Sequence, residues 1–285
     1  MEGQGPGAEM PSLGRLRGFA FDLDGTIWAG PTLLPGAGEL VEGLRSEGLA
    51  VVFATNSSRH GARILADRLT AMGVRAGERD VLAAFDLVAE EITRRLGRVR
   101  VMALATPDMD ELLAAAGHEV VGVDDWPRAQ AVVVGNDPAF DFGRLRAASR
   151  AVAAGAAFFA VNMDPRYPVA ADTFDPGCGA LAEAVATAAE VRPIVIGKPF
   201  APLFERTLER LGCSAGEAAM VGDSLGSDVD GARAMGMFTV WIDGRGEADR
   251  GDAARADMVA RNLPELHRIW QNQRKISGMT PQPAQ

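Results

Sequence analysis

Short apolar runs alternate along the chain with segments whose apolar positions recur at helical spacing. The first run, at residues 19–21, is followed by a helical pattern at 37–47 and then by a second run at 49–54. Strand, helix and strand joined by short connections form the unit of a parallel sheet with right-handed crossovers. Because uninterrupted apolar runs indicate strands covered on both faces, the pattern predicts an α/β protein built on a parallel sheet.

A second series of alternating elements separates the two halves of this pattern. We expect in turn a helix at 81–96, a strand at 99–105, a helix at 108–116, a strand at 131–134, a helix at 142–154 and a strand at 157–161. Such a segment is far too long for a loop between two elements of one sheet. We therefore expect a main domain in two parts, 12–79 and 179–270, around an inserted α/β domain at 80–178, with disordered tails at 1–11 and 271–285.

Charge and cysteine content narrow the function classes. The 285 residues include 29 basic and 38 acidic side chains, a net charge of −9, which argues against non-specific nucleic-acid binding because that needs a basic surface. Cys178 and Cys213 have neither metal-site spacing nor the density of a disulfide scaffold, which favours a reducing, cytoplasmic setting. No apolar run approaches the ~18 residues of a membrane span, and the first residues lack the order of a signal peptide, so we expect a soluble protein without a membrane partner.

Two acidic residues, Asp22 and Asp24, follow the first apolar run and precede Gly25 and Thr26. Open α/β sheets bind ligands at the carboxyl ends of their strands. Side chains two positions apart in an extended segment start on the same side, so these carboxylates need a cation, and Mg²⁺ takes one or two carboxylates from a protein. One aspartate could attack phosphorus while the other handles the leaving-group proton. The alternative is an ordinary turn, for which Asp and Gly are common; we favour the chemistry.

Small polar residues, Thr55, Asn56 and Ser57, follow the second apolar run. A parallel crossover aligns the carboxyl ends of both strands, so we expect these residues beside the two aspartates, as donors to phosphate oxygens. The alternative is that Ser57 or Ser58 only caps a helix at 59–72.

Two further strand ends carry a lysine and a pair of acids. Lys198 follows an expected strand of the main domain at 193–196, where it could neutralise the surroundings of the nucleophile and hold a phosphate as a point charge. Asp223 and Asp228 follow the apolar run at 218–222; Asp223 could reach a metal and Asp228 could support it. Singly, Lys198 would be a surface charge and Asp228 a helix cap. Together the four strand ends supply the groups that metal-assisted phosphoryl transfer requires.

A loop without periodicity at 162–168 follows the last strand of the inserted domain. It carries Asn162, Asp164 and Arg166. Such loops can determine specificity, although most are only connections, so both interpretations of these three residues stay open.

These motifs, in this order, resemble those of the haloacid dehalogenase superfamily. Asp22-Leu-Asp-Gly-Thr26 matches its first motif, Thr55 its second, Lys198 its third, and Gly222-Asp-Ser-Leu-Gly-Ser-Asp228 its fourth. The resemblance spans roughly residues 17–245.

The inserted domain and two local segments narrow the resemblance. Ala54-Thr-Asn-Ser-Ser-Arg59 and Ile196-Gly-Lys-Pro199 are similar to segments of subfamily IIA, the NagD-like and para-nitrophenylphosphatase-like phosphatases. This implies a Rossmann-like parallel-sheet core with an inserted α/β cap domain of the C2 type. Family members often carry Thr-Asn-Pro-Asp where this chain has Val161-Asn-Met-Asp164.

The resemblance also implies roles for the site residues. Asp22 would be the nucleophile that forms an aspartyl-phosphate, and Asp24 would protonate the leaving alkoxide and then activate water. Mg²⁺ would be held by Asp22, the backbone carbonyl of Asp24 and Asp223, with Asp228 in the outer shell. The residues expected to bind the phosphoryl group are Thr55, Asn56, Ser57 and Lys198.

We therefore expect a Mg²⁺-dependent phosphatase for a small phosphorylated metabolite, of the sugar phosphate, nucleotide, phosphoglycolate or glycerol phosphate class. The second aspartate, Asp24, argues against the dehalogenase branch, which has no leaving alkoxide to protonate. A phosphomutase or phosphotransferase would pass the phosphoryl group to a second hydroxyl instead of water. A non-catalytic binding protein would lack one of the motif residues, and none is missing. A homodimer is left open as the oligomeric state.

Overall fold

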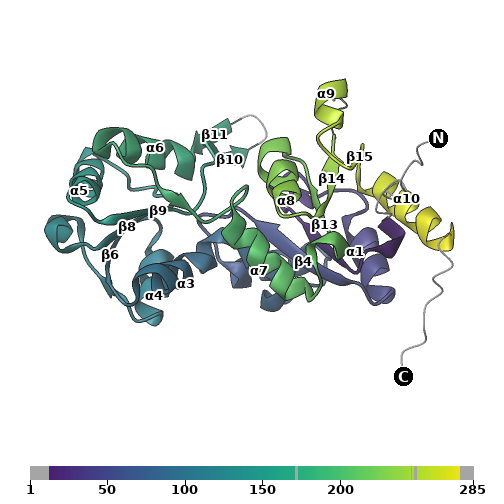
Figure 1. The fold of residues 1–285 in the computed structure, drawn as a ribbon, viewed down its shortest axis with the longest axis horizontal. Helices are drawn as coiled ribbons and strands as arrows, with labels where there is room; N and C mark the ends of the chain where they lie inside the picture. Colours follow the sequence, from purple (N-terminus) through teal and green to yellow (C-terminus); the bar gives the residue numbers. More distant parts are fainter. Residues whose placement is uncertain (1–12, 171–172, 245, 247–248, 277–285) are drawn as a thin grey trace, which may run out of the picture.

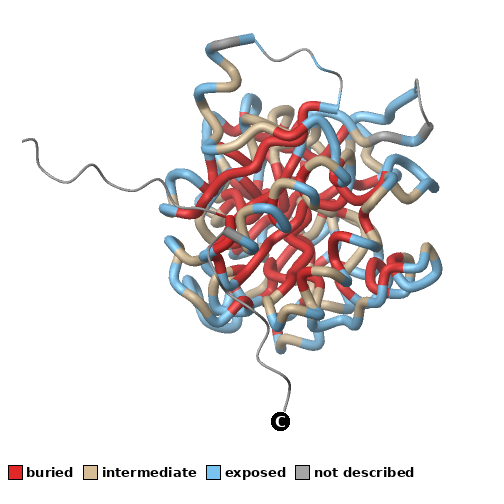
Figure 2. Tube along the Cα trace, turned by 90° about the vertical axis from the view of Figure 1, so that its right-hand side faces the viewer, coloured by how far each residue is buried: buried red, intermediate tan, exposed pale blue. Residues whose placement is uncertain are grey.

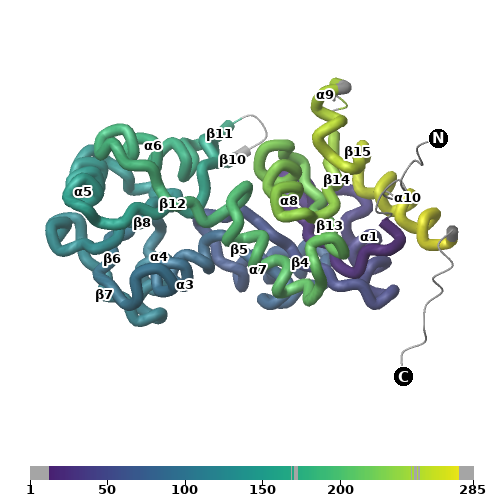
Figure 3. The backbone as a smooth tube through the Cα atoms, viewed as in Figure 1, coloured from purple at the N-terminus to yellow at the C-terminus, as the bar shows by residue number. Residues whose placement is uncertain are grey.

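The computed structural model describes residues 13–170, 173–244, 246 and 249–276. Two lobes lie side by side along its long axis, as Figure 1 shows, and Figure 3 traces the same path through the Cα atoms. The chain passes from the first lobe into the second after Ala83 and returns after Val195. The second lobe is therefore an insertion into the first.

The first lobe is built on a six-stranded parallel sheet in the order β15-β14-β13-β1-β4-β5. Its strands are β1 (Gly18–Phe21), β4 (Ala50–Thr55), β5 (Val81–Ala83), β13 (Ala218–Gly222), β14 (Phe238–Ile242) and β15 (Met258–Ala260). A short hairpin, β2 (Trp28–Ala29) with β3 (Thr32–Leu33), follows β1.

Helices cover this sheet and connect its strands. They are α1 (Ala37–Ser46), α2 (Ala62–Ala71), α7 (Ala201–Leu211), α8 (Asp230–Ala234), α9 (Arg250–Ala253) and α10 (Leu263–Ile276). Helix α7 packs on β1, β4 and β5, whereas α1 packs on β4 and against α10. Shorter 3-10 turns are η1 (Leu13–Arg15), η2 (Glu78–Asp80) and η4 (Ala215–Glu217), and η5 (Leu225–Val229) is a π-helical turn before α8.

The second lobe is built on a five-stranded parallel sheet in the order β12-β9-β8-β6-β7. Its strands are β6 (Arg100–Leu104), β7 (Glu119–Val120), β8 (Ala131–Val134), β9 (Ala157–Ala160) and β12 (Ile194–Val195). Its helices are α3 (Ala84–Leu96), α4 (Pro107–Ala115), the 3-10 segment η3 (Val123–Arg128), α5 (Phe142–Ala153) and α6 (Cys178–Ala189). An antiparallel hairpin of β10 (Arg166–Ala170) and β11 (Thr173–Pro176) reaches toward the first lobe (Figure 1).

The central strands of both sheets are buried along their whole length. Every residue of β1, β8 and β13 is buried, and Figure 2 shows buried segments running through the interior of the molecule. Parallel strands need helices on both faces, which is why their sequences are continuous apolar runs. The first polar residue after each run therefore marks the edge of the sheet.

Two strand assignments differ from the expectation. The segment expected at 193–196 forms β12, but it pairs with β9 of the second sheet, so its assignment to the main domain is wrong. Residues 81–83, expected to begin a helix, form β5 and pair with β4 in the first sheet. Both strands have only two or three residues, and so short a run carries no period that could identify its partner.

The boundaries between the two lobes consequently differ from the expected domain boundaries at 80 and 179. Helix α6, expected in the main domain, packs on α5, β8 and β9 of the second lobe. Helix α10 continues to Ile276, so the expected tail at 271–285 is helical over its first residues. The other expected tail residues, 1–11 and 277–285, lie outside the described residues. No helix among the described residues is long and apolar enough to cross a bilayer.

Candidate active site

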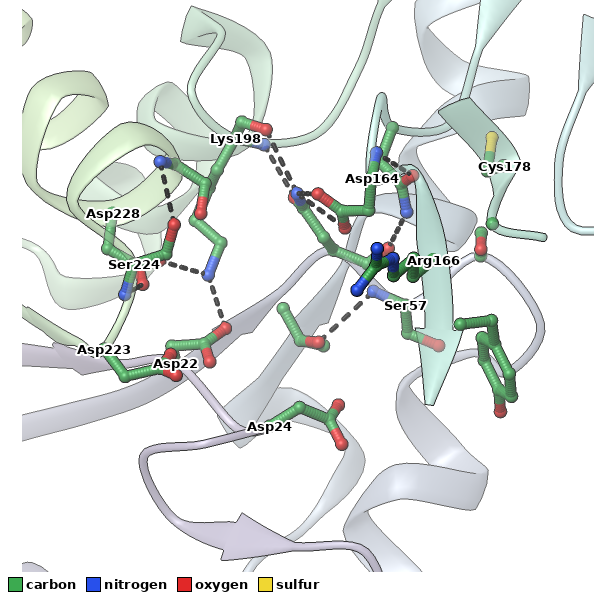
Figure 4. A pocket seen from close by; sticks show the side chains of 17 residues that line it. Asp22, Asp24, Ser57, Asp164, Arg166, Cys178, Lys198, Asp223, Ser224 and Asp228 are labelled. Atoms are coloured by element: carbon green, nitrogen blue, oxygen red, sulfur yellow. Dashed lines mark hydrogen bonds and ion pairs between the residues drawn. The ribbon is translucent and has the colours of Figure 1, made fainter. Parts of the chain in front are cut away.

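The carboxyl ends of three neighbouring strands meet beside the second lobe. Strands β1, β4 and β13 lie next to one another, and they end at Asp22, Thr55 and Asp223. These side chains line a pocket of ≈ 260 Å³ that residues of the second lobe close from the other side (Figure 4). The convergence expected from the four strand ends is thus present, since Lys198 and Asp228 line the same pocket.

Lys198 is the centre of the most buried part of the pocket. Its Nζ donates to Asp22 Oδ1 at 2.5 Å, to Asp228 Oδ1 at 2.7 Å and to the carbonyl oxygen of Ala54 at 2.8 Å. The side chain is only 2% exposed. All three hydrogens of the ammonium therefore have a partner, and the amine fixes one oxygen of Asp22.

The charges in this part of the pocket do not balance. Burial raises the pKa of Asp22 well above its usual range, Lys198 lowers it, and Asp228 and Asp223 raise it further. Burial, and after it the negative charge of Asp228, likewise raises the pKa of Asp223 to about 6. Burial would lower the pKa of Lys198, but Asp22 and Asp228 outweigh it and raise that pKa, so the amine stays charged. One ammonium faces three carboxylates.

A divalent cation would neutralise this excess of negative charge. One oxygen each of Asp22, Asp223 and Asp228 lie within 4.8 Å of one another, and carboxylate oxygens are the ligands that Mg²⁺ takes in proteins. Both oxygens of Asp228 already accept hydrogen bonds, from Lys198 Nζ and from the backbone N–H of Ser224. Asp22 and Asp223 are then the carboxylates with an oxygen free to bind the metal ion, and Asp228 lies beside them without a free oxygen.

Gly25 makes room for this group. It adopts a left-handed conformation with φ +88°, and a Cβ atom there would lie 2.1 Å from Oδ2 of Asp223. Only glycine allows both the backbone conformation and the close approach of the carboxylate. The Asp-Gly pair after β1 is therefore required by the site as well as by the turn.

Asp24 lies apart from the three carboxylates. Its side chain is exposed to the pocket and accepts a hydrogen bond from Trp28 Nε1 at 2.8 Å. Figure 4 shows the carboxylate turned away from Asp22. The expected metal contact concerned only the backbone carbonyl of Asp24, and the position of its side chain leaves the carboxylate available to a leaving group.

The loop after β4 does not cap the next helix. Ser57 Oγ donates to the carbonyl of His60 and accepts from its N–H, while Thr55 Oγ1 accepts the N–H of Ser57 at 3.2 Å. Helix α2 begins only after Gly61, with no side-chain cap of its own. The interpretation of Ser57 as the cap of that helix is therefore wrong, and Thr55 and Ser57 both line the pocket.

Asn56 is committed to contacts within the protein. Its Oδ1 accepts the backbone N–H of Lys198 at 2.7 Å, and its Nδ2 donates to the carbonyl of Lys198 at 3.0 Å and to Asp164 Oδ2 at 3.2 Å. An amide nitrogen has two hydrogens, so no side-chain donor of Asn56 remains for a phosphate. Instead this residue holds Lys198 in register with the loop after β4.

Residues of the second lobe complete the pocket. Asn162 donates to the carbonyl of Asn56, and its Oδ1 accepts the N–H of Asp164; burial raises the pKa of the Asp164 carboxyl. Arg166 and Tyr167 also line the pocket, and Tyr167 is not among the site residues expected from the sequence. A tyrosine in a two-stranded hairpin carries no local signal, whereas the polar loop before it did.

Comparison with known proteins identifies the family. Residues 19–119 match the model of haloacid dehalogenase-like hydrolases, and residues 195–266 match a second model, described as HAD-hydrolase-like. Human chronophin is 33% identical over 240 residues, which cover 80% of this chain and 81% of the relative.

Solved structures show the same architecture. A 4-nitrophenylphosphatase from Thermotoga maritima, 30% identical, has a TM-score of 0.81 and covers 91% of this chain and 99% of its own. A glycerol phosphate phosphatase from Mycobacterium tuberculosis, solved in complex with magnesium, is 29% identical, has a TM-score of 0.78 and covers 91% of this chain and 79% of its own. The chain belongs to the haloacid dehalogenase superfamily of hydrolases, within subfamily IIA of NagD-like and para-nitrophenylphosphatase-like proteins.

Proposed function

We propose that the protein is a Mg²⁺-dependent phosphomonoesterase that acts on a small phosphorylated metabolite through an aspartyl-phosphate on Asp22. The observation that carries this proposal is the arrangement around Asp22: one oxygen is fixed by Lys198, while a separate carboxylate, Asp24, stands in the open part of the pocket. Two of the similar solved structures carry the names 4-nitrophenylphosphatase and glycerol phosphate phosphatase, which agree with it.

The reaction follows from the positions of the two aspartates. The free oxygen of Asp22 attacks phosphorus, the bond between phosphorus and the ester oxygen breaks, and Asp24 gives its proton to the departing alkoxide. Asp24 then takes a proton from water, the water oxygen attacks phosphorus, and the bond to Asp22 breaks to release phosphate. Mg²⁺, held by Asp22 and Asp223, supplies charge stabilisation for the transferring group when bound.

Other pocket residues would bind the phosphoryl oxygens and limit the size of the leaving group. Lys198 favours the ionised form of Asp22 and holds positive charge near the phosphoryl oxygens, while the hydroxyl of Thr55 is a donor for those oxygens. The volume of ≈ 260 Å³ lies just below the ~300–1,000 Å³ of pockets for drug-sized ligands, which favours a compact leaving group.

The test removes the nucleophile. Asp22→Asn should abolish release of p-nitrophenol from p-nitrophenyl phosphate in the presence of Mg²⁺, with an unchanged circular dichroism spectrum. Asp67→Asn, at an exposed position of α2, is the matched control and should keep full activity. Retained activity in Asp22→Asn would exclude the aspartyl-phosphate.

A second measurement separates hydrolysis from transfer. For a phosphatase, the amounts of inorganic phosphate and alcohol released are equal even when a second alcohol is added. Less phosphate than alcohol would show transfer to a hydroxyl and support a phosphotransferase. Full activity in the presence of a metal chelator would exclude the role of Mg²⁺.

A further inference from the structure

Arg59 reaches from the first lobe into the second. It comes directly after the pocket-lining loop that follows β4, and its carbonyl accepts a hydrogen bond from Thr106 at 3.4 Å. Its guanidinium lies 3.8 Å from the ring centroid of Tyr167, 3.4 Å from Asp175 Oδ2 and within hydrogen-bond distance of Asn136 Oδ1. All four partners belong to the second lobe, so this one residue links the two.

Three of these contacts converge on the hairpin of β10 and β11. Tyr167 and Asp175 stand directly opposite each other on the two strands, so Arg59 binds both members of one cross-strand pair. Asn136 is 1% exposed, and its Nδ2 donates to the carbonyl of Pro176 at the end of β11. The guanidinium therefore fixes the hairpin at both strands, directly and through Asn136.

The hairpin has little other anchorage among the described residues. All four residues of β11 are exposed, and Val169 and Phe174 are 51% and 53% exposed. The helix that packs on both strands of the hairpin is α6. An element with so little buried apolar surface depends on a few specific contacts for its position.

The same hairpin forms one wall of the pocket. Arg166 and Tyr167 both line it, and Figure 4 shows Arg166 across the pocket from Asp22. The position of this wall sets how much room remains for a leaving group. Arg59 is not among the residues that line the pocket, and its guanidinium is engaged by Tyr167, Asp175 and Asn136, so we expect it to act on substrate through the hairpin.

We propose that Arg59 is a positioning residue that holds the hairpin over the phosphoryl site and so selects compact leaving groups. This rests on the proposed phosphatase function. The guanidinium contacts the aromatic face of Tyr167, forms an ion pair with Asp175 and donates a hydrogen bond to Asn136. Lysine cannot reproduce this combination because its ammonium is not planar. When the contact is lost, the wall moves away, and compact substrates lose their complementary surface.

The test compares Arg59→Ala and Arg59→Lys with Arg63→Ala. Arg63 is exposed near the start of α2, four residues further along, so its replacement removes the same charge without touching the hairpin. For Arg59→Ala, kcat/KM with glycerol phosphate should fall about tenfold, the size expected for loss of a partly buried cation–π contact with its ion pair. With the bulkier AMP it should stay constant or rise. Arg59→Lys should lie in between, and Arg63→Ala should match the wild type.

Two further readouts distinguish positioning from a general structural role. The inhibition constant of inorganic phosphate, which occupies only the phosphoryl site, should change by less than about twofold because Asp22 and Lys198 are untouched. Amide hydrogen exchange of the hairpin should accelerate in Arg59→Ala, while that of β1 and β4 should not.

The outcomes separate the two proposals. An unchanged preference for glycerol phosphate over AMP together with unchanged exchange would overturn the role of Arg59, as would a parallel loss of phosphate inhibition, both activities and thermal stability. If the wild type hydrolyses no phosphomonoester, the phosphatase function fails, and the exchange experiment still decides whether Arg59 holds the hairpin.

Discussion

Removal of the Lys198 amine should destabilise the folded protein much more than removal of an exposed cation. The ammonium binds Asp22 and Asp228 at 2.5 and 2.7 Å, and the side chain is 2% exposed. Loss of one partner of a buried ion pair typically costs about 3–5 kcal/mol, because the remaining charge is left buried. Lys198→Met keeps the aliphatic stem and removes only the charge. At about 2–4 °C per kcal/mol for a chain of this size, the Tm should fall by roughly 6–20 °C.

The chain offers a matched control for this experiment. It has two lysines, and the other, Lys275, is exposed near the end of α10. Lys275→Met removes the same charge and should change the free energy of unfolding by no more than about 0.5 kcal/mol. Thermal unfolding of the wild type and both variants, followed by circular dichroism in the presence of a chelator, measures the difference.

Addition of Mg²⁺ tests the cause of the loss. Since the deficit in Lys198→Met is one of positive charge among carboxylates, millimolar Mg²⁺ should raise its Tm more than it raises the Tm of the wild type. Equal Tm values for the two lysine variants, or a smaller response to Mg²⁺ in Lys198→Met than in the wild type, would refute the reasoning.

Three further predictions concern single groups. Asp24→Asn should slow hydrolysis of an alkyl phosphate far more than that of an aryl phosphate, because an aryloxide leaves without a proton; equal losses in steady-state kinetics would remove Asp24 from this role. Burial raises the pKa of Cys178 to about 12, so at pH 8 its thiol is neutral and a disulfide reagent should modify at most Cys213 until urea is added; two reactive thiols in the native protein would contradict this. Asp86 accepts the N–H of Ala62 at 2.7 Å at the start of α2, so Asp86→Ala should cost about 1–2 kcal/mol, whereas Asp86→Asn keeps the acceptor. Burial also raises the pKa of Asp86, so its folded form binds protons more tightly and wild-type stability falls as the pH rises through that pKa. Other buried carboxyl groups with raised pKa values contribute to the same fall, so urea unfolding at several pH values should show a smaller fall in Asp86→Asn than in the wild type, and an equal fall in the two would exclude a contribution of Asp86.

The parts of the site that follow a long buried strand could be predicted from the sequence. Asp22, Thr55 and Asp223 each come directly after an apolar run of three residues or more, and the structure places all three at one edge of one sheet. The physical reason is that a buried parallel strand must be apolar throughout, so its end is visible as the first polar residue.

The parts that depend on contacts between distant segments could not be predicted. The pairing of β12 with β9 is one case, because two residues have no periodicity that identifies a neighbour. The engagement of Asn56 with the backbone of Lys198 is another, since an amide after a strand is equally suited to phosphate and to protein partners. Tyr167 owes its place in the pocket to a hairpin that Arg59 holds from another lobe.

The return path of the chain joins the movement of one lobe to the chemistry of the other. Lys198 lies three residues after Val195, and β12 is hydrogen-bonded into the sheet of the inserted lobe beside Phe159 and Ala160. A swing of that lobe would therefore act on the segment that carries the ammonium, against the two hydrogen bonds by which Asn56 holds the Lys198 backbone to the loop after β4. The position of the inserted lobe and the contact between the ammonium and Asp22 would then be mechanically linked.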